Sequence, residues 1–338
     1  MARTPIFEKK NVLVTGGAGF IGSHLCERLL HEAKVICLDS FLNSSEQNID
    51  HLLQQPDFEF IRADITEPVD LESFPELKKF KIAFQGVQEI YHLACPTSIK
   101  NFQQYKMETV LAQSLGTKNA LDLAVQYASS FLLASSAVVY GSRRPDGAPF
   151  REEDIGCVDQ LSARACYDEG KRFAETLTET FRDVHGIDAK IARVFRTYGP
   201  KQRLFDAEMI PDFITSAIDG KELVIYGDAS FSTTLTYVSD VVDGMIKLMR
   251  ASPGIGPVNL GTQHAVKIAD VAQRVVEMLN SSSKITFAPS VLFCTPLGIP
   301  DIRKAKELLG WLPLVRLEDG LKKSIDYALA HKSLIGMA

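Results

Sequence analysis

Short apolar runs separated by longer amphipathic patterns make up the first 195 residues of the chain. The runs are typical of strands buried on both faces, and the segments between them repeat apolar positions at helical spacing. This alternation predicts parallel strands joined by crossover helices, and therefore an α/β fold with a doubly wound parallel sheet. The predicted strands are residues 11–15, 34–38, 58–61, 89–94, 131–136 and 189–195.

The alternation stops after residue 195, where shorter and more irregular elements follow. We expect a smaller mixed α/β C-terminal lobe over residues 196–338, partly interleaved with a larger nucleotide-binding domain over residues 1–195. Ligand clefts favour such domain boundaries, so we expect the substrate to bind between the two parts. The predicted elements of the lobe are strands at 223–226, 257–260 and 284–287 and helices at 301–309 and 317–330.

A glycine-rich turn, Gly-Gly-Ala-Gly-Phe-Ile-Gly at positions 16–22, directly follows the first predicted strand and leads into a helical pattern. Gly16 allows a tight turn, Gly19 lets the backbone approach a pyrophosphate at the helix N-terminus, and Gly22 permits close packing of helix on strand. Strand, glycine turn and helix in this order predict a dinucleotide-binding site.

Acidic residues lie at the ends of the second and third predicted strands. Asp39 is placed to accept hydrogen bonds from the hydroxyls of an adenosine ribose and to repel a 2′-phosphate, which favours NAD over NADP. The alternative that Asp39 only starts a turn stays open. Asp64 follows the third strand, a position that suits an aspartate near the adenine amino group.

A tyrosine and a lysine four residues apart, Tyr167 and Lys171, are candidates for proton transfer. Residues at this spacing lie side by side on a helix, so the phenol and the ammonium can act on one substrate atom. Ser136, at the carboxyl end of the fifth strand, can bind the same oxygen. The pair by itself is also compatible with a surface tyrosine beside a solvated lysine. His92, inside an apolar strand, is interpreted as a packed core histidine.

Composition narrows the classes of function. The 338 residues carry a net charge of -5 without a long basic cluster, so nucleic acid and anionic membranes are not expected as partners. The 6 cysteines show no Cys-x-x-Cys pairing, which argues against a metal site and a disulfide framework. The N-terminus has no signal-peptide pattern and no segment reaches membrane-spanning length, so we expect a cytoplasmic protein.

These motifs occur together, in a fixed order along the chain. In both respects the chain resembles an extended short-chain dehydrogenase/reductase of the NAD-dependent epimerase/dehydratase family, over nearly its whole length. Within that family it is most similar to UDP-glucuronate decarboxylases, also called UDP-xylose synthases. The motifs that carry the resemblance are Val-Thr-Gly-Gly-Ala-Gly-Phe-Ile-Gly-Ser-His at 14–24, Tyr-His-Leu-Ala at 91–94, Ser-Ser-Ala-Val-Val-Tyr-Gly at 135–141, Arg-Ala-Cys-Tyr-Asp-Glu-Gly-Lys-Arg at 164–172, Tyr-Gly-Pro at 198–200, Tyr-Val-Ser-Asp at 237–240, Asn-Leu-Gly at 259–261 and Leu-Gly-Trp at 309–311.

The resemblance implies a Rossmann fold with tightly held NAD and oxidation of a sugar C4 hydroxyl, with Tyr167 as base, Lys171 lowering its pKa and Ser136 holding the oxygen. The product of this oxidation would be a 4-keto sugar nucleotide, and the resemblance implies that the nucleotide is UDP. The implied NAD contacts are Gly16, Gly19, Phe20, Ile21, Gly22, Asp39, Ser40, Asn43, Asp64, Ile65, Leu93, Tyr167, Lys171 and Thr197. The implied substrate contacts are Cys95, Ala137, Val138, Arg196, Arg203 and Thr233.

Several positions depart from the decarboxylase pattern. Ala137 and Val138 replace a Ser-Glu pair beside Ser136, a change toward 4-epimerases, while Arg196 replaces an asparagine and Thr233 an arginine. Arginines bind diphosphates bidentately, so these exchanges alter how a nucleotide is held, and Arg196 or Arg203 is a candidate to compensate.

We therefore expect a sugar-nucleotide enzyme that is decarboxylase-like but has altered substrate contacts, with 4-epimerisation or elimination as alternative second steps. A reductase of a non-nucleotide ketone or alcohol and a non-catalytic nucleotide-binding protein are further alternatives. The resemblance also implies a homodimer built from the helix that begins near residue 106 and the helix that carries Tyr167.

Overall fold

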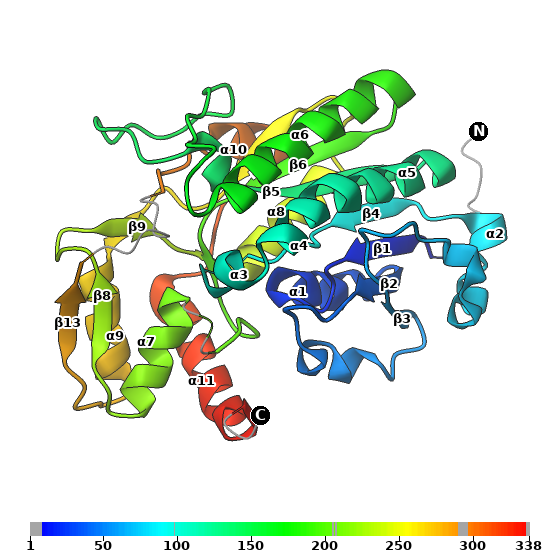
Figure 1. Ribbon diagram of the computed structural model, residues 1–338. Helices are drawn as coiled ribbons and strands as arrows, with labels where there is room; N and C mark the ends of the chain where they lie inside the picture. The colour runs from blue at the N-terminus through cyan, green and yellow to red at the C-terminus, as the bar shows by residue number, and fades with distance from the viewer. Residues whose placement is uncertain (1–8, 98, 205, 207, 290–296, 336–338) are drawn as a thin grey trace.

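A seven-stranded parallel sheet forms the centre of the molecule (Figure 1). The computed structural model describes residues 9–97, 99–204, 206, 208–289 and 297–335. The strands follow the order β11-β6-β5-β4-β1-β2-β3, which confirms the predicted doubly wound sheet. They are β1 Asn11–Thr15, β2 Lys34–Asp39, β3 Phe58–Arg62, β4 Glu89–His92, β5 Ser130–Ser136, β6 Ala189–Val194 and β11 Pro257–Leu260.

Strand β1 shows why apolar runs become strands here. All five of its residues are buried, and alternate side chains enter different cores, with Val12 and Val14 on one side and Leu13 on the other. Because β1 pairs with β2 on one edge and β4 on the other, the strand order reverses between β1 and β4. A crevice opens at the carboxyl ends of strands at such a reversal, and ligands bind there.

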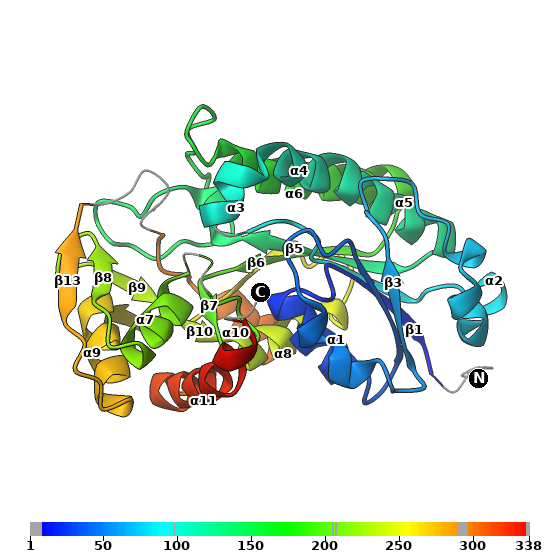
Figure 2. The ribbon, with the colours of Figure 1, turned by 60° about the horizontal axis from the view of Figure 1, so that its bottom comes forward.

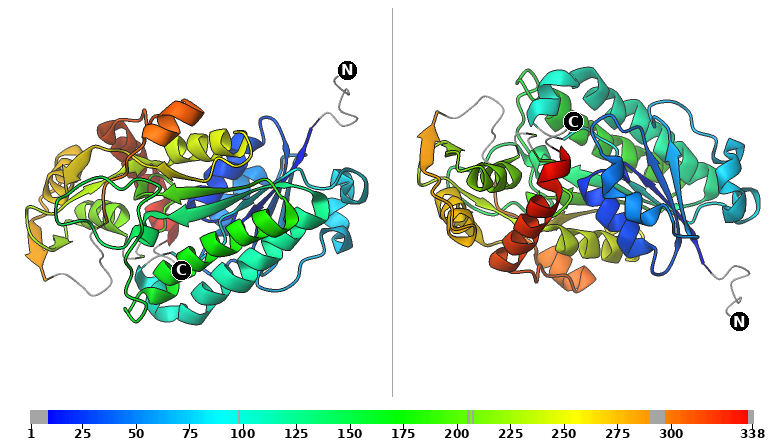
Figure 3. Two further views of the ribbon diagram at one scale, coloured as in Figure 1. Left: turned by 90° about the horizontal axis from the view of Figure 1, so that it is seen from above. Right: turned by 90° about the horizontal axis from the view of Figure 1, so that it is seen from below.

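Helices cover both faces of the sheet (Figure 2). One layer holds α4, η5, α5 and α6, in which α5 and α6 run side by side along the sheet (Figure 3), and the other holds α1 and α8. The bounds of these helices are α1 Phe20–Leu29, α4 Lys106–Leu111, the π-helical turn η5 Ala112–Gly116, α5 Thr117–Tyr127, α6 Ala165–His185 and α8 Val238–Met249. Shorter helices outside the two layers are α2 Ile82–Gln85, α3 Ile99–Gln104 and α10 Arg303–Leu309.

A smaller lobe packs beside the carboxyl ends of the strands and contains three two-stranded sheets. Its strands are β7 Thr197–Tyr198 with β10 Thr236–Tyr237, β9 Ser232–Thr234 with β12 Ala265–Lys267, and β8 Leu223–Tyr226 with β13 Ile285–Ala288. Its helices are α7 Met209–Ile218, α9 Ile268–Met278 and α11 Leu317–Ile335. Among the residues that the structure describes, no helix combines the length and apolar character that a membrane crossing requires.

The predicted place of strand 257–260 was wrong. We expected it in the smaller lobe, but it forms β11 and pairs with β6 at the edge of the large sheet. An apolar run indicates a strand but does not indicate which strand it pairs with. Here α8 packs on the large sheet and leads the chain back to its edge. The sheet therefore has one more strand than the six expected.

Candidate active site

The glycine-rich turn between β1 and α1 presents bare backbone at the crevice. Gly16 adopts a φ of +71°, and a Cβ on it would lie 2.7 Å from the backbone nitrogen of Ala94. A Cβ on Gly22 would overlap the carbonyl oxygen of Gly16, whereas one on Gly19 would meet only that oxygen, at 3.2 Å. The turn therefore brings backbone close to a ligand at the N-terminus of α1, where free N–H groups suit a pyrophosphate.

The carboxylate of Asp39 lies buried at the end of β2 and is held in place by its surroundings. It accepts hydrogen bonds from the backbone nitrogens of Ala18, at 3.1 Å, and Phe41, at 2.9 Å. The hydroxyl of Ser44 donates a third bond of 2.7 Å. Asp39 starts a turn and also lines the cavity described below, and its contact with an adenosine ribose stays a prediction.

Ser136, Tyr167 and Lys171 meet where the carboxyl end of β5 faces the first turns of α6. Ser136 lies near the phenol of Tyr167 and acts to lower its pKa, and the ring of Tyr167 stacks on Phe102 with 4.8 Å between centroids. The Lys171 ammonium donates to the carbonyl oxygen of Ala134 at 2.8 Å and lies 5.8 Å from the centre of the Tyr167 ring. Both side chains of the helix are buried. The three residues thus line the same cavity.

Burial is the largest influence on the pKa values of Tyr167 and Lys171. It raises the pKa of Tyr167 above its ordinary value, and Ser136 and the charge of Arg164 act in the opposite direction. Burial also lowers the pKa of Lys171, and the nearby Glu175 partly restores it. Additional positive charge beside the phenol would therefore be needed to favour its anion at neutral pH.

One large cavity of about 1330 Å³ connects the glycine turn, this trio and the smaller lobe. The sequence-predicted residues that line it are Gly16, Gly19, Phe20, Ile21, Gly22, Asp39, Ser40, Asn43, Asp64, Ile65, Leu93, Cys95, Ser136, Val138, Tyr167, Lys171, Arg196, Thr197 and Arg203. Within the described residues, no cluster of three or more His, Cys, Asp and Glu side chains is arranged to hold a metal ion.

Two predicted substrate contacts, Ala137 and Thr233, do not line this cavity. Ala137 is buried in a small apolar cluster with Tyr140 and Phe150, since it starts a 3-10 turn that directs its side chain away. Thr233 is 4% exposed in β9, where it pairs with Val266 of β12. The structure therefore does not bring these two residues to the cavity lining.

Arg164 is a cavity residue that the sequence motifs did not single out. It precedes α6, forms an ion pair of 2.9 Å with Asp168, and holds its guanidinium 5.4 Å from the centre of the Phe102 ring and 6.0 Å from that of Tyr167. Its position three residues before the Tyr-x-x-x-Lys motif was the available signal, because a residue at that spacing faces the same side of a helix.

Three carboxylates, Asp206, Glu208 and Asp212, also line the cavity and were not predicted. Burial raises the pKa of Glu208 to about 7, with Arg196 opposing this rise and Asp206 and Asp212 adding to it. Burial likewise raises the pKa of Asp212 to about 6. The spacing of these acids after the Tyr-Gly-Pro motif gave only a weak signal, because segment 204–212 has no simple periodicity.

Gln113 connects the π-helical turn η5 to the start of α6, the helix that carries Tyr167 and Lys171. Its side-chain amide donates to the carbonyl oxygens of Cys166, at 3.2 Å, and Tyr167, at 3.4 Å. Gly170 permits this approach, since a Cβ there would lie 2.8 Å from the amide carbon of Gln113. The irregular turn therefore contributes to the placement of Tyr167, as π-turns often do near functional sites.

His92 lies beneath the site in the core, as predicted. It is 2% exposed, and its ring nitrogens are hydrogen-bonded to the hydroxyls of Thr15, at 2.7 Å, and Thr117, at 3.2 Å. Burial lowers its pKa to about 3, with the charge of Lys171 acting in the same direction. The ring is therefore neutral and serves packing.

Comparisons with known proteins agree with this geometry. The profile of the NAD dependent epimerase/dehydratase family matches residues 12–261. UDP-glucuronic acid decarboxylase 1 of Xenopus tropicalis is 38% identical over 95% of this chain and 72% of its own length. UDP-glucuronic acid 4-epimerase from Bacillus cereus, solved with UDP-glucuronic acid and NAD, has a TM-score of 0.81 and 27% identity over 95% of this chain and 99% of its own. UDP-glucose 4-epimerase from Thermotoga maritima, solved with UDP-glucose, has a TM-score of 0.82 and 25% identity over 96% and 99%. The chain therefore belongs to the NAD-dependent epimerase/dehydratase family of extended short-chain dehydrogenases/reductases and uses NAD as its cofactor.

Proposed function

We propose that this enzyme oxidises the C4 hydroxyl of a UDP-linked sugar to a 4-keto intermediate, with UDP-glucuronate as the first candidate substrate. The observation that carries the proposal is the junction of Ser136, Tyr167 and Lys171 with the glycine turn in one cavity. Relatives by sequence and by structure are named for UDP-glucuronic acid, which supports the choice of substrate.

The chain's own residues account for the proton in this step. The Tyr167 oxygen, as the phenolate, takes the proton of the C4 hydroxyl while Ser136 holds the same oxygen by a hydrogen bond. Lys171, fixed by the carbonyl oxygen of Ala134, lies one helical turn away and stabilises the phenolate by its charge. When bound, NAD would supply a positively charged nicotinamide ring beside the phenol and the capacity to accept a hydride. The glycine turn and Asp39 are the residues that would hold it.

The second step depends on the groups beside Ser136. With a carboxylate on C5, the 4-keto sugar loses CO2 because the C4 carbonyl accepts the electron pair of the broken bond. A proton then adds at C5, and return of the hydride to C4 gives the UDP-pentose. Return of the hydride to the other face of C4 would instead give the epimer. Val138 lines the cavity at this point and Ala137 does not. Because both side chains are aliphatic, neither offers an acid or a base. This specific feature favours 4-epimerisation as the second candidate function.

Incubation of the purified protein with UDP-glucuronate, UDP-glucose and UDP-galactose tests the proposal. Release of CO2 with UDP-pentose formation supports decarboxylation, whereas UDP-galacturonate without CO2 supports epimerisation. Net reduction of NAD in step with a ketone or alcohol outside the panel would favour the alternative reductase. Absence of any product and any keto intermediate across the panel would count against the proposal and favour a non-catalytic nucleotide-binding protein.

We further propose a homodimer formed through the outer face of the α4–η5–α6 layer. Apolar side chains are exposed along it, including Met107 (66%), Leu115 (48%) and Phe173 (50%). Contiguous exposed apolar side chains are typical of protein interfaces. A cytoplasmic location is the matching proposal for compartment, supported by the free thiols of Cys26, Cys37, Cys95, Cys157 and Cys166.

A further inference from the structure

A buried hydroxyl lies directly behind the proposed catalytic serine. Ser135 and Ser136 are neighbours at the end of β5, so their side chains point to opposite faces of the sheet. Both serines line the cavity, but Ser135 is 3% exposed and its hydroxyl donates a hydrogen bond of 2.5 Å to Glu175. Glu175 lies one helical turn beyond Lys171 on α6. The strand that carries Ser136 is thereby connected to the helix that carries the other two groups.

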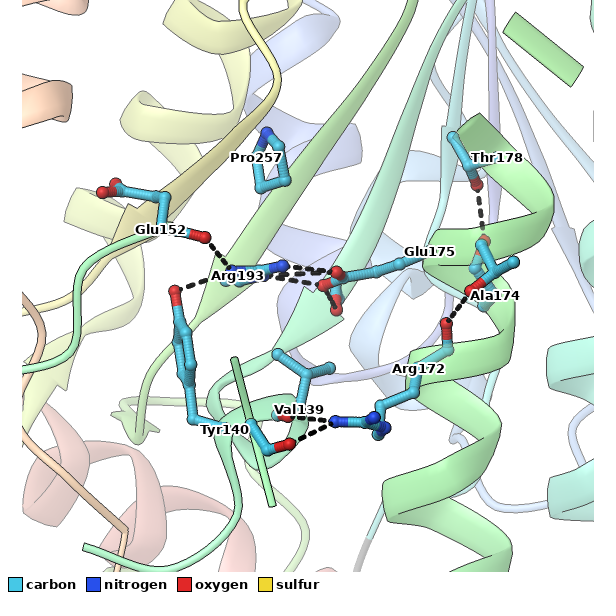
Figure 4. A network of polar contacts seen from close by, with 12 residues as sticks. Val139, Tyr140, Glu152, Arg172, Ala174, Glu175, Thr178, Arg193 and Pro257 are labelled. Carbon is cyan, nitrogen blue, oxygen red and sulfur yellow. Dashed lines mark hydrogen bonds and ion pairs between the residues drawn. The ribbon is translucent and has the colours of Figure 1, made fainter. Parts of the chain in front are cut away.

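Arg193 of β6 completes this connection (Figure 4). Its guanidinium donates to both carboxylate oxygens of Glu175, with nitrogen to oxygen distances of 2.7 and 2.9 Å. A third nitrogen donates to the Tyr140 hydroxyl and to the carbonyl oxygen of Glu152, each at 2.9 Å. The guanidinium also lies 4.8 Å from the centre of the Tyr140 ring. A single side chain thus connects α6 to the turn that follows Ser136.

The far end of the network reaches the edge strand of the sheet. The Tyr140 hydroxyl donates to the side-chain oxygen of Asn259 in β11 at 2.7 Å, and the backbone nitrogen of Asn259 donates to the Glu152 carboxylate at 2.9 Å. Ser135 is therefore bonded to α6, and the turn that follows Ser136 is bonded to β6 and β11, which are distant in sequence. A buried ion pair of this kind adds little net stability compared with apolar packing, so specificity of position is the better reason for it.

We propose that Glu175 and Arg193 are positioning residues of the reaction, which hold the end of β5 against α6 so that Ser136 stays within hydrogen-bonding reach of Tyr167. The inference rests on the proposed function, since it assigns a role toward Ser136 in that chemistry. Neither residue lines the cavity, so neither touches the substrate.

The variant Glu175→Gln tests the proposal, because the amide keeps the shape but not the paired charge. We expect kcat for sugar oxidation to fall by about 10-fold while KM stays within about 2-fold, since small displacements of reacting groups cost rate rather than affinity. The matched control is Glu179→Gln, which breaks the partly exposed pair with Arg182 on the same helix and should leave kcat unchanged.

Action through Ser136 gives a second readout. In a Ser136→Ala background, Glu175→Gln should cost less than about 2-fold further, because the group being positioned is already absent. An equal loss in both backgrounds would mean a purely structural role and overturn the proposal, as would an unchanged kcat. If Glu175→Gln does not fold, Ser135→Ala removes only the hydrogen bond of 2.5 Å and should show the same dependence on Ser136.

A crystal structure of Glu175→Gln provides a readout that needs no turnover. We expect the Ser136 hydroxyl to move away from the Tyr167 phenol relative to the parent structure, and an unchanged separation would refute the inference. If the parent enzyme converts no sugar of the panel while the variant structure shows the displacement, the proposed function fails but the positioning role stands.

Discussion

At the scale of single residues, Tyr167 shows how a buried phenol can be prepared for base catalysis. Burial holds its pKa above the ordinary value, while Ser136 and Arg164 act against that rise. The ammonium of Lys171 donates a hydrogen bond of 2.8 Å to the carbonyl oxygen of Ala134, which orients it. In the proposed mechanism, the hydroxyl of Ser136 and the ammonium of Lys171 favour the phenolate, and the positive ring of NAD would supply the remaining charge.

The variant Tyr167→Phe removes the proton acceptor and leaves the ring that stacks on Phe102. We expect sugar oxidation to fall by about 10²- to 10⁴-fold, the usual contribution of a general base, while bound NAD is retained. Single-turnover absorbance of reduced nicotinamide measures the rate. Tyr127→Phe, a phenol outside the cavity, is the control, and a loss of less than about 10-fold in Tyr167→Phe would contradict the assignment.

Glu208 predicts a pH dependence of substrate affinity. Because burial raises its pKa to about 7, the carboxyl is largely neutral below that pH and ionised above it. Ionised Glu208 offsets the positive charge of Arg196 and repels a diphosphate, so KM for a sugar nucleotide should rise by about 3- to 10-fold between about pH 6 and pH 8.

The pH profile of Glu208→Gln checks this expectation. The neutral amide should keep KM low and flat across the same range, whereas Glu277→Gln on the exposed face of α9 should retain the wild-type profile. A rise in KM that persists in Glu208→Gln would assign the titration to another group.

At the scale of elements, glycines have two different roles in the turn between β1 and α1: close packing at Gly22 and approach of a ligand at Gly19. Gly22 is required by packing, because its Cβ would overlap the backbone of Gly16, whereas Gly19 has room for a Cβ with a small shift. We expect Gly22→Ala to lower the free energy of unfolding by about 1 to 3 kcal/mol, as overpacking does, and to lose NAD.

Gly19→Ala should keep the thermal midpoint of the cofactor-free protein within about 2 °C yet lose NAD, because the added methyl occupies the surface left to the pyrophosphate. Thermal unfolding and the NAD content of purified protein measure both effects. Retention of NAD in Gly19→Ala would show that the pyrophosphate does not approach this backbone.

Comparison of the predicted and observed strands shows where the local sequence pattern was sufficient to place a strand. The strand at 11–15 agrees with β1 residue for residue, because a strand covered on both faces needs an unbroken apolar run. The strand at 257–260 was recognised but placed wrongly, since its partner β6 lies more than 60 residues earlier in the chain. Pairing over that distance is decided by packing rather than by composition.

At the scale of the whole molecule, the exposed apolar side chains of α4 and α6 predict the assembly. We expect Phe173→Asp to convert a dimer to a monomer in light scattering, because a buried unpaired carboxylate is costly at an interface. Phe84→Asp, at a side chain that is 86% exposed on α2, should leave the mass unchanged. A monomeric parent protein would refute the proposed homodimer.

The sequence by itself determined the elements and the reactive groups, because apolar periodicity, the glycine spacing and the Tyr-x-x-x-Lys interval are local properties. Tertiary structure decided which groups share a cavity. It placed Ala137 and Thr233 outside the cavity lining and Arg164 and Glu208 on it. It also bonded Glu175 to both Arg193 and Ser135, the neighbour of Ser136. The physical reason is that these contacts join β5, β6, α6 and the lobe across long loops, and their distances depend on how whole elements pack.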